Sequence, residues 1–131
     1  MRTARRQPTS LWFGGFGVLC VVTLVGNPMI AGAARGSKPL IAPVLSARPL
    51  ASTKIELSWN DLNTNETGYT IDRLDPATKR FQFVATTPKN ATTYSDTGLA
   101  PAATYTYRVR TVGRRNTFSR YSNVATAQTP R

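Results

Sequence analysis

The residues most able to do chemistry in this sequence are arginines near its C-terminal end. Residues 113–120 read Gly-Arg-Arg-Asn-Thr-Phe-Ser-Arg, and two further arginines precede this segment on the pattern of a strand. Guanidinium groups bind phosphate and carboxylate through paired hydrogen bonds, and an aromatic ring can stack on a base or a sugar. We therefore predict a binding surface for an anionic partner. Its candidate ligand-binding residues are Arg108, Arg110, Arg114, Arg115, Phe118 and Arg120.

The same residues also have a structural interpretation. Charged side chains at the edge of a β-sheet discourage pairing with the edge of another sheet. Surface charge also keeps a protein soluble, and Phe118 would then serve to pin its loop to the sheet. From the sequence alone, both interpretations stay open.

Catalytic chemistry has little support in the sequence. There is no histidine, which excludes imidazole bases and histidine-based metal sites, and the single thiol is Cys20. The strand pattern puts most of the six acids on outward strand positions or in turns, with Glu66 in a turn. The acids are Glu56, Asp61, Glu66, Asp72, Asp75 and Asp96. Since no nucleophile–base pair, phosphate-binding loop or metal spacing accompanies them, we expect no catalysis, no cofactor and no metal site.

The charge balance favours anionic partners. The chain carries 17 Lys and Arg residues against six acids, a formal net charge of +11. Three of the cations precede residue 34, so the remainder keeps a formal charge of +8. A field of this sign attracts nucleic acid, acidic polysaccharide, wall polymers or lipid headgroups.

Residues 1–34 have the organisation of a targeting segment. A short basic stretch precedes an uncharged apolar run over residues 11–26, and Ala-Gly-Ala follows at residues 31–33. This order predicts a secretory signal peptide that is cleaved after Ala33. The alternative is an uncleaved anchor, because the apolar run extended to Ile30 is about 20 residues long and long enough to span a bilayer. Either case predicts a location outside the cytoplasm, secreted or at the cell surface, with a single-pass anchor if cleavage fails.

The rest of the chain has the pattern of a β-sandwich. Residues 35–43 form a connector with proline and glycine, and residues 44–130 a single domain. Apolar and polar residues alternate most clearly over residues 54–59 and 103–112, as in half-buried strands. Turn-forming residues separate the strands, so we predict an all-β fold, a seven-stranded antiparallel two-sheet sandwich. The strands are expected near residues 44–48, 54–59, 69–72, 80–86, 92–95, 103–112 and 121–128.

Short motifs in a fixed order occur along the same segment. They are Pro43-Val44-Leu45, Ile55-x-Leu57-x-Trp59, Gly68-Tyr69-x-Ile71, Tyr94-x-Asp96-x-Gly98-Leu99-x-Pro101, Tyr105-x-Tyr107-x-Val109 and Ser119-x-Tyr121-Ser122-Asn123. Over residues 40–130 this set resembles the fibronectin type III domain, in the version common in exported bacterial proteins.

The resemblance implies core-building roles for two aromatic residues. Trp59 is expected to be the buried tryptophan of the second strand. Tyr105 is expected to form a tyrosine corner, in which its phenol bonds to backbone near Leu99-x-Pro101. The Arg-Gly-Asp tripeptide of some adhesive members is absent from this chain, so integrin-type adhesion does not carry over.

Together these features predict an exported, monomeric, non-catalytic binding module of fibronectin type III type. Its expected partner is a protein or an anionic polymer such as a wall polymer or an acidic glycan. Nucleic acid is less favoured, and a membrane is expected only if the leader stays attached. The alternative is a structural spacer or accessory domain, a remnant of a larger exported enzyme, with no ligand of its own.

Overall fold

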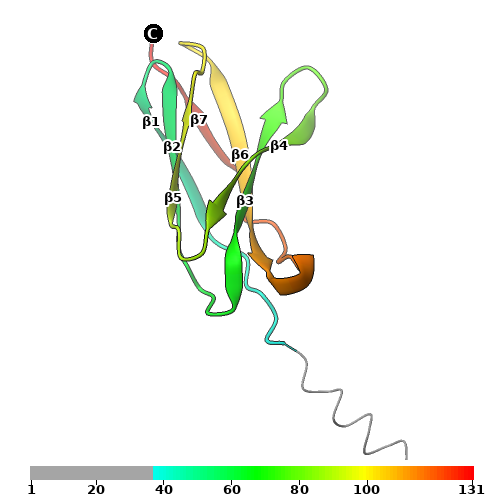
Figure 1. Cartoon of the computed structure of the whole chain (residues 1–131). Coiled ribbons are helices and arrows are strands. Elements are labelled where there is room, and N and C mark those ends of the chain that lie inside the picture. Colours follow the sequence, from blue (N-terminus) through cyan, green and yellow to red (C-terminus); the bar gives the residue numbers. More distant parts are fainter. Residues whose placement is uncertain (1–36) are drawn as a thin grey trace, which may run out of the picture. The chain divides into compact units, whose positions relative to one another are not determined.

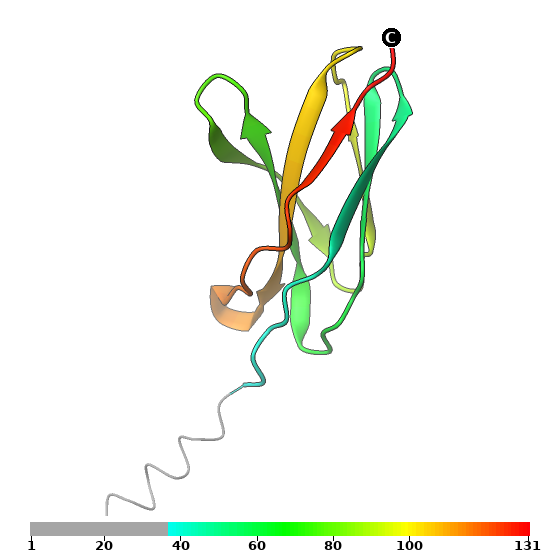
Figure 2. The ribbon, with the colours of Figure 1, turned by 180° about the vertical axis from the view of Figure 1, so that it is seen from behind.

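The computed structural model describes residues 37–131, and residues 38–131 form one compact unit. This unit is a sandwich of two antiparallel sheets, with strand orders β1-β2-β5 and β4-β3-β6-β7 (Figures 1 and 2). The predicted all-β, seven-stranded, two-sheet fold is therefore confirmed. The elements are β1 (Leu45–Ala51), β2 (Lys54–Trp59), β3 (Glu66–Asp75), β4 (Arg80–Pro88), β5 (Thr93–Thr97), β6 (Thr104–Gly113), the 3₁₀ turn η3 (Arg114–Asn116) and β7 (Ala125–Gln128).

The predicted signal segment and its cleavage site lie outside the described residues. Across residues 37–131, no helix has the length and apolar character needed to span a bilayer. The last part of the expected connector lies against the sandwich. The side-chain amide of Asn63 receives a hydrogen bond from the Ile41 N–H and donates one to the Ile41 carbonyl, at 2.8 and 3.0 Å.

The core lies between the two sheets and follows from the alternation in the sequence. Ile55 and Leu57 of β2 face Ile71 of β3 and Val109 of β6 across the sandwich, and all four are fully buried. Trp59 is 5 % exposed, as the resemblance implied. Its ring contacts that of buried Tyr69 in a tilted arrangement, with 5.4 Å between the ring centroids.

The tyrosine corner is also present. The backbone N–H of Ala100 donates a hydrogen bond of 2.9 Å to Oη of Tyr105. This bond fixes the turn before β6, and it confirms the role that the resemblance implied for Tyr105.

Strand β4 contains a β-bulge that changes which of its side chains face the core. Ile71 pairs with Ala85 while its neighbour Asp72 pairs with Phe83, so Val84 is an extra residue. Val84 packs against the core, whereas Phe83 is 65 % exposed on an edge strand.

The last strand is shorter than the sequence predicted. The expected strand covered residues 121–128, but β7 begins at Ala125. Two serines ahead of it take over the hydrogen bonding to β6. Ser119 donates its backbone N–H to the Thr111 carbonyl and accepts the Thr111 N–H on Oγ, and Ser122 does the same with Val109. Because serine hydroxyls satisfy the backbone here, the segment runs along β6 without being a strand.

Candidate functional site

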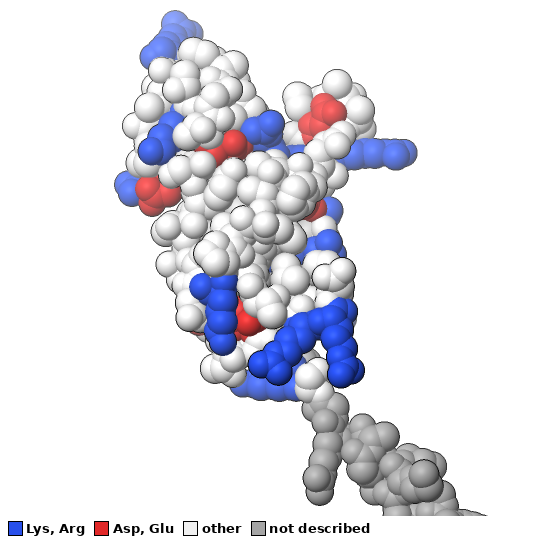
Figure 3. Space-filling model, viewed as in Figure 1, with Lys and Arg blue, Asp and Glu red and all other residues white. Residues whose placement is uncertain are grey.

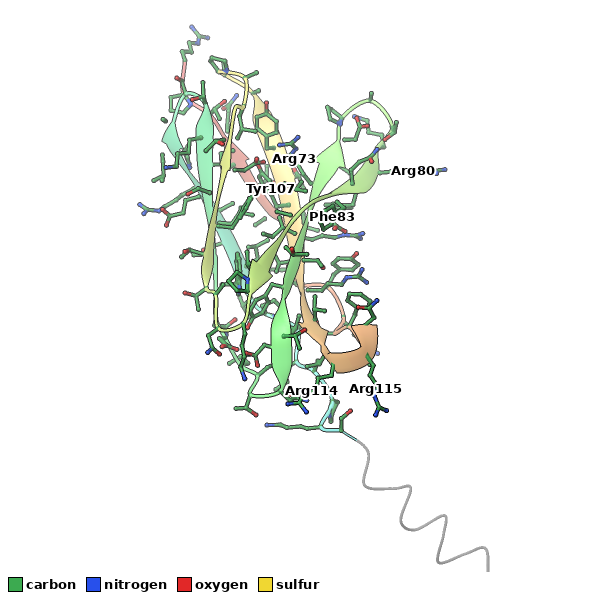
Figure 4. All side chains as sticks on the ribbon, in the orientation of Figure 1. Arg73, Arg80, Phe83, Tyr107, Arg114 and Arg115 are labelled. Carbon is green, nitrogen blue, oxygen red and sulfur yellow. The ribbon has the colours of Figure 1, made fainter. Side chains whose placement is uncertain are left out.

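The tip of the candidate site is the turn η3 at the end of β6. The N–H of Gly113 donates to the Thr117 carbonyl at 2.8 Å, and the backbone is left-handed at Arg115 and Asn116, with φ of 57° and 56°. This tight turn leaves the side chains of Arg114 and Arg115 exposed at the end of the molecule (Figure 4). Arg120 is exposed as well, and it directly follows Ser119, whose N–H donates to the Thr111 carbonyl of β6.

Two lysines that the sequence reasoning missed lie at the same end of the sandwich. Lys38 precedes the sandwich, and its carbonyl accepts a 2.8 Å hydrogen bond from the side chain of Asn65. Lys89 follows Pro88, which pairs with Gly68 at the start of β3. Neither stands in a charged run, so only the fold brings them to this end. We call the following five residues the basic end: Lys38, Lys89, Arg114, Arg115 and Arg120.

The cations of the basic end are exposed and make no ion pairs within the described residues. All five of its side chains belong to exposed residues, and Lys and Arg side chains gather at this end of the molecule in Figure 3. Within residues 37–131, the ion pairs are made by other arginines, namely Arg48, Arg73 and Arg108. The basic end is therefore a surface of exposed cations that form no ion pair within the described residues.

Arg108 and Arg110, also expected in the site, are instead engaged on the outer face of β6. The guanidinium of Arg108 lies 3.5 Å from the ring centroid of Tyr121 and 4.2 Å from that of Phe81. The guanidinium of Arg110 lies 3.9 Å from the ring centroid of Phe118 and 4.8 Å from that of Tyr121. These five side chains form what we call the arginine stack, and each such contact contributes about 0.5–2 kcal/mol.

Both arginines of the arginine stack also make polar contacts. Nη2 of Arg108 pairs with the Asp72 carboxylate at 2.9 Å, and Nε of Arg110 donates to Oγ1 of Thr70 at 3.2 Å. Because Phe118 packs on Arg110, the stack ties the loop after η3 to the sheet. Arg108, Arg110 and Phe118 thus position the loop, whereas Arg114, Arg115 and Arg120 are exposed.

The acids play structural roles in the described residues. Glu66 was expected in a turn, but it lies in β3 and is 2 % exposed, and neither of its carboxylate oxygens has a hydrogen-bond partner within the described residues. Asp96 is buried in β5, where it accepts hydrogen bonds from Oη of Tyr107 at 2.8 Å and from Nη1 of Arg73 at 2.6 Å. No group of three or more potential metal-ligating side chains occurs within residues 37–131.

Two buried tyrosines make the stability of the domain sensitive to alkaline pH. Burial, together with a hydrogen bond to Asp96, raises the pKa of Tyr107 well above its ordinary value near 10, and burial with a hydrogen bond to Asp61 does the same for the pKa of Tyr69. A raised folded-state pKa contributes stability that is complete below about pH 10 and is lost as the pH rises further. We therefore expect the temperature of half-unfolding to decrease as the pH is raised above about 10.

Circular dichroism of thermal unfolding between about pH 7 and pH 12 checks this prediction. Lysines also titrate in this range, so the control is the Tyr69→Phe/Tyr107→Phe variant, which keeps the lysines and removes both phenols. Its melting point should fall less steeply above pH 10 than that of the unsubstituted chain. An equal fall in both proteins would show that the tyrosines are not responsible.

Comparison with known proteins places the domain in a family. The family model for the Fibronectin type III domain matches residues 41–128. An α-amylase of Niallia circulans is 34 % identical over 94 residues, which cover 70 % of this chain and 7 % of the amylase. The chain thus spans less than a tenth of that curated relative.

Solved structures show the same fold. The β-1,2-glucanase of Parabacteroides distasonis superimposes with a TM-score of 0.65 at 24 % identity, over 73 % of this chain and 14 % of the glucanase. An Fn3-like protein of Clostridium thermocellum superimposes with a TM-score of 0.59 at 26 % identity, over 72 % of this chain and 97 % of that protein.

Proposed function

This chain belongs to the fibronectin type III family, and from that premise we propose that it is an extracytoplasmic, non-catalytic module that binds an anionic polymer through its basic end. The observation that carries the proposal is the clustering of exposed cations at one end of the sandwich, where they form no ion pair within residues 37–131. Cations without partners attract anions and gain charge-assisted hydrogen bonds when the anions bind.

The layout of the basic end suits a polymer better than a small anion. Its cations come from four separate stretches of chain, at residues 38, 89, 114–115 and 120. Lys and Arg side chains are spread over the surface at this end of the sandwich in Figure 3. Spread charges of this kind match the repeated anionic groups of a polymer, whereas a small anion is held by donors that converge on it.

The aromatic residues favour an acidic glycan or wall polymer over nucleic acid. Proteins that bind single strands offer free aromatic faces on which bases stack. Here the ring of Phe118, although the residue is 43 % exposed, already has the guanidinium of Arg110 at 3.9 Å from its centroid, and the ring of Tyr121 lies against Arg108. The basic end itself supplies arginine and lysine, which suffice for carboxylates or phosphates.

The alternative function is a spacer or accessory domain. The comparisons support it, because the similar segments make up only 7 % of the α-amylase and 14 % of the glucanase. A spacer requires a stable fold and no ligand, so this alternative predicts that removing the cations of the basic end changes no binding.

Substituting Arg114, Arg115 and Arg120 by alanine tests the proposal. We expect the triple variant to bind a carboxylated polysaccharide about a hundredfold more weakly, because each lost contact contributes about 1 kcal/mol. The matched control removes the same charge elsewhere, with Arg48→Ala, Arg80→Ala and Arg131→Ala. Binding is measured by isothermal titration calorimetry with polygalacturonate, for residues 38–131, which contain the whole described core.

The control variant distinguishes a specific binding site from general electrostatic attraction to a positively charged domain. The control variant should lose about threefold in affinity or less, since its cations lie away from the basic end. Equal losses in the two variants would mean that only total charge matters, and the spacer function would then replace the proposal.

A further inference from the structure

A second surface of this domain has the composition of a binding cleft, and it lies at the opposite end of β3 from the basic end. The hairpin of β3 and β4 leans away from the rest of the sandwich, and a notch separates the two in the space-filling view (Figures 1 and 3). A cleft of about 230 Å³ lies here, and Figure 4 shows Arg73 and Phe83 in this region. The lining residues used below are Arg73, Asp75, Gln82, Phe83 and Tyr105.

Two aromatic residues contribute to the lining. Phe83 is 65 % exposed, and the bulge at Val84 keeps it out of the core. Tyr105 is held in place by the hydrogen bond from Ala100 to its Oη. A large exposed aromatic residue in a concave surface is a common mark of a ligand site.

The polar groups of the cleft are fixed before any ligand arrives. Nη1 of Arg73 is held at 2.6 Å from the Asp96 carboxylate, and its guanidinium lies 5.5 Å from the ring centroid of Tyr105. The Asp75 carboxylate accepts the Ala77 N–H at 2.8 Å and the Gln82 amide at 3.4 Å. Polar groups that are already oriented lower the entropic cost of binding.

The charges of the cleft argue against an acidic ligand. Arg73 and Asp75 contribute one charge of each sign, and Asp96 already pairs with Arg73. What remains is a set of hydrogen-bonding groups beside apolar aromatic surface. This combination matches a ring that has hydroxyl groups around its edge and C–H bonds on its faces.

We propose that this cleft binds a neutral oligosaccharide. The cleft is smaller than pockets for drug-sized ligands, which measure about 300–1,000 Å³, so it takes a single sugar ring of a longer chain. Hydroxyl groups of that ring donate to Asp75 and accept from Gln82 and Arg73, and a face of the ring packs on the aromatic lining. This site does not depend on the basic end.

Nuclear magnetic resonance of ¹⁵N-labelled residues 38–131 tests the proposal. The probes are maltohexaose, cellohexaose and laminarihexaose, each raised to about 20 mM, a range that detects millimolar affinity. We expect at least one probe to shift the backbone amides of Gln82, Phe83 and Val84 in a saturable manner. In the Gln82→Ala/Phe83→Ala variant the affinity should fall about tenfold or more.

Both substituted residues are exposed, so the fold should survive, and the amide spectrum of the variant verifies this. The matched control is Val124→Ala, since Val124 is another exposed apolar residue, 56 % exposed, and does not line the cleft. It should bind the sugar as the unsubstituted domain does.

Several results would overturn the proposal: no shifts with any probe, shifts confined to other surfaces, or unchanged affinity in the cleft variant. Binding of galacturonate oligomers alone at this cleft would contradict its neutral preference. The Arg114→Ala/Arg115→Ala/Arg120→Ala variant should keep full sugar binding, so the cleft and the basic end can each fail without the other.

Discussion

Replacing Trp59 by alanine is expected to lower the free energy of unfolding by about 3–5 kcal/mol. Trp59 is 5 % exposed, lies between the sheets and contacts the ring of Tyr69. Its Nε1 makes no hydrogen bond within the described residues, so the loss comes from packing and from the cavity left behind. Since a small domain has about 5–15 kcal/mol of stability in total, the variant should be close to unfolding at 37 °C.

Urea denaturation of residues 38–131, followed by circular dichroism, measures this effect. The control is Trp59→Phe, which keeps an aromatic ring against Tyr69 and should lose less than half as much stability. A Trp59→Ala variant with near-normal stability would contradict the packing of the core around this residue.

Replacing Asp96 by alanine is the second large effect. The carboxylate is 5 % exposed and accepts from Oη of Tyr107 and from Arg73. Its removal leaves the buried Tyr107 hydroxyl and the Arg73 guanidinium without their acceptor. We expect a loss of about 2–4 kcal/mol, below the upper range for a buried pair, because the Arg73 side chain is 36 % exposed and reaches water.

A double-mutant cycle with Tyr107→Phe checks the cause of this loss. In the Tyr107→Phe background, Asp96→Ala leaves one fewer buried polar group without a hydrogen-bond acceptor. The effects of the two substitutions on the free energy of unfolding should therefore be less than additive by about 1 kcal/mol or more. Additive losses would mean that the hydrogen bond between these residues does not stabilise the fold.

Much of the sandwich could be predicted because its strongest signals are local. The alternation at residues 54–59 predicts β2 and its buried face, including Trp59. The resemblance carried by Leu99-x-Pro101 and Tyr105 implies the tyrosine corner, which the hydrogen bond from the Ala100 N–H to Tyr105 confirms. Each of these features depends on residues that are close together in the chain.

The features that were missed depend on register between distant segments. Strand β7 begins at Ala125, later than predicted, because the side chains of Ser119 and Ser122 bond to β6 ahead of it. The alternation of apolar residues gives no sign of such hydrogen bonds. The burial of Glu66 follows from the full length of β3, which begins earlier than the apolar pattern indicates.

Only part of the candidate site could be predicted, because some of its residues are neighbours in the sequence and others come together only in the fold. A run of arginines in one loop is visible in the sequence, whereas the engagement of Arg108 by Asp72 and Tyr121 requires three segments to meet. The positions of Lys38 and Lys89 at the basic end likewise depend on the order of the strands in the two sheets.

We propose that the basic end forms a specific site for an anionic polymer. Its most direct test is the affinity of residues 38–131 for polygalacturonate, single-stranded DNA and anionic vesicles at about 50 and 150 mM salt. We predict about tenfold preference or more for polygalacturonate, retained at the higher salt. Weak binding to all three that disappears together as salt rises would reveal only a general positive field, and the domain would then be a spacer.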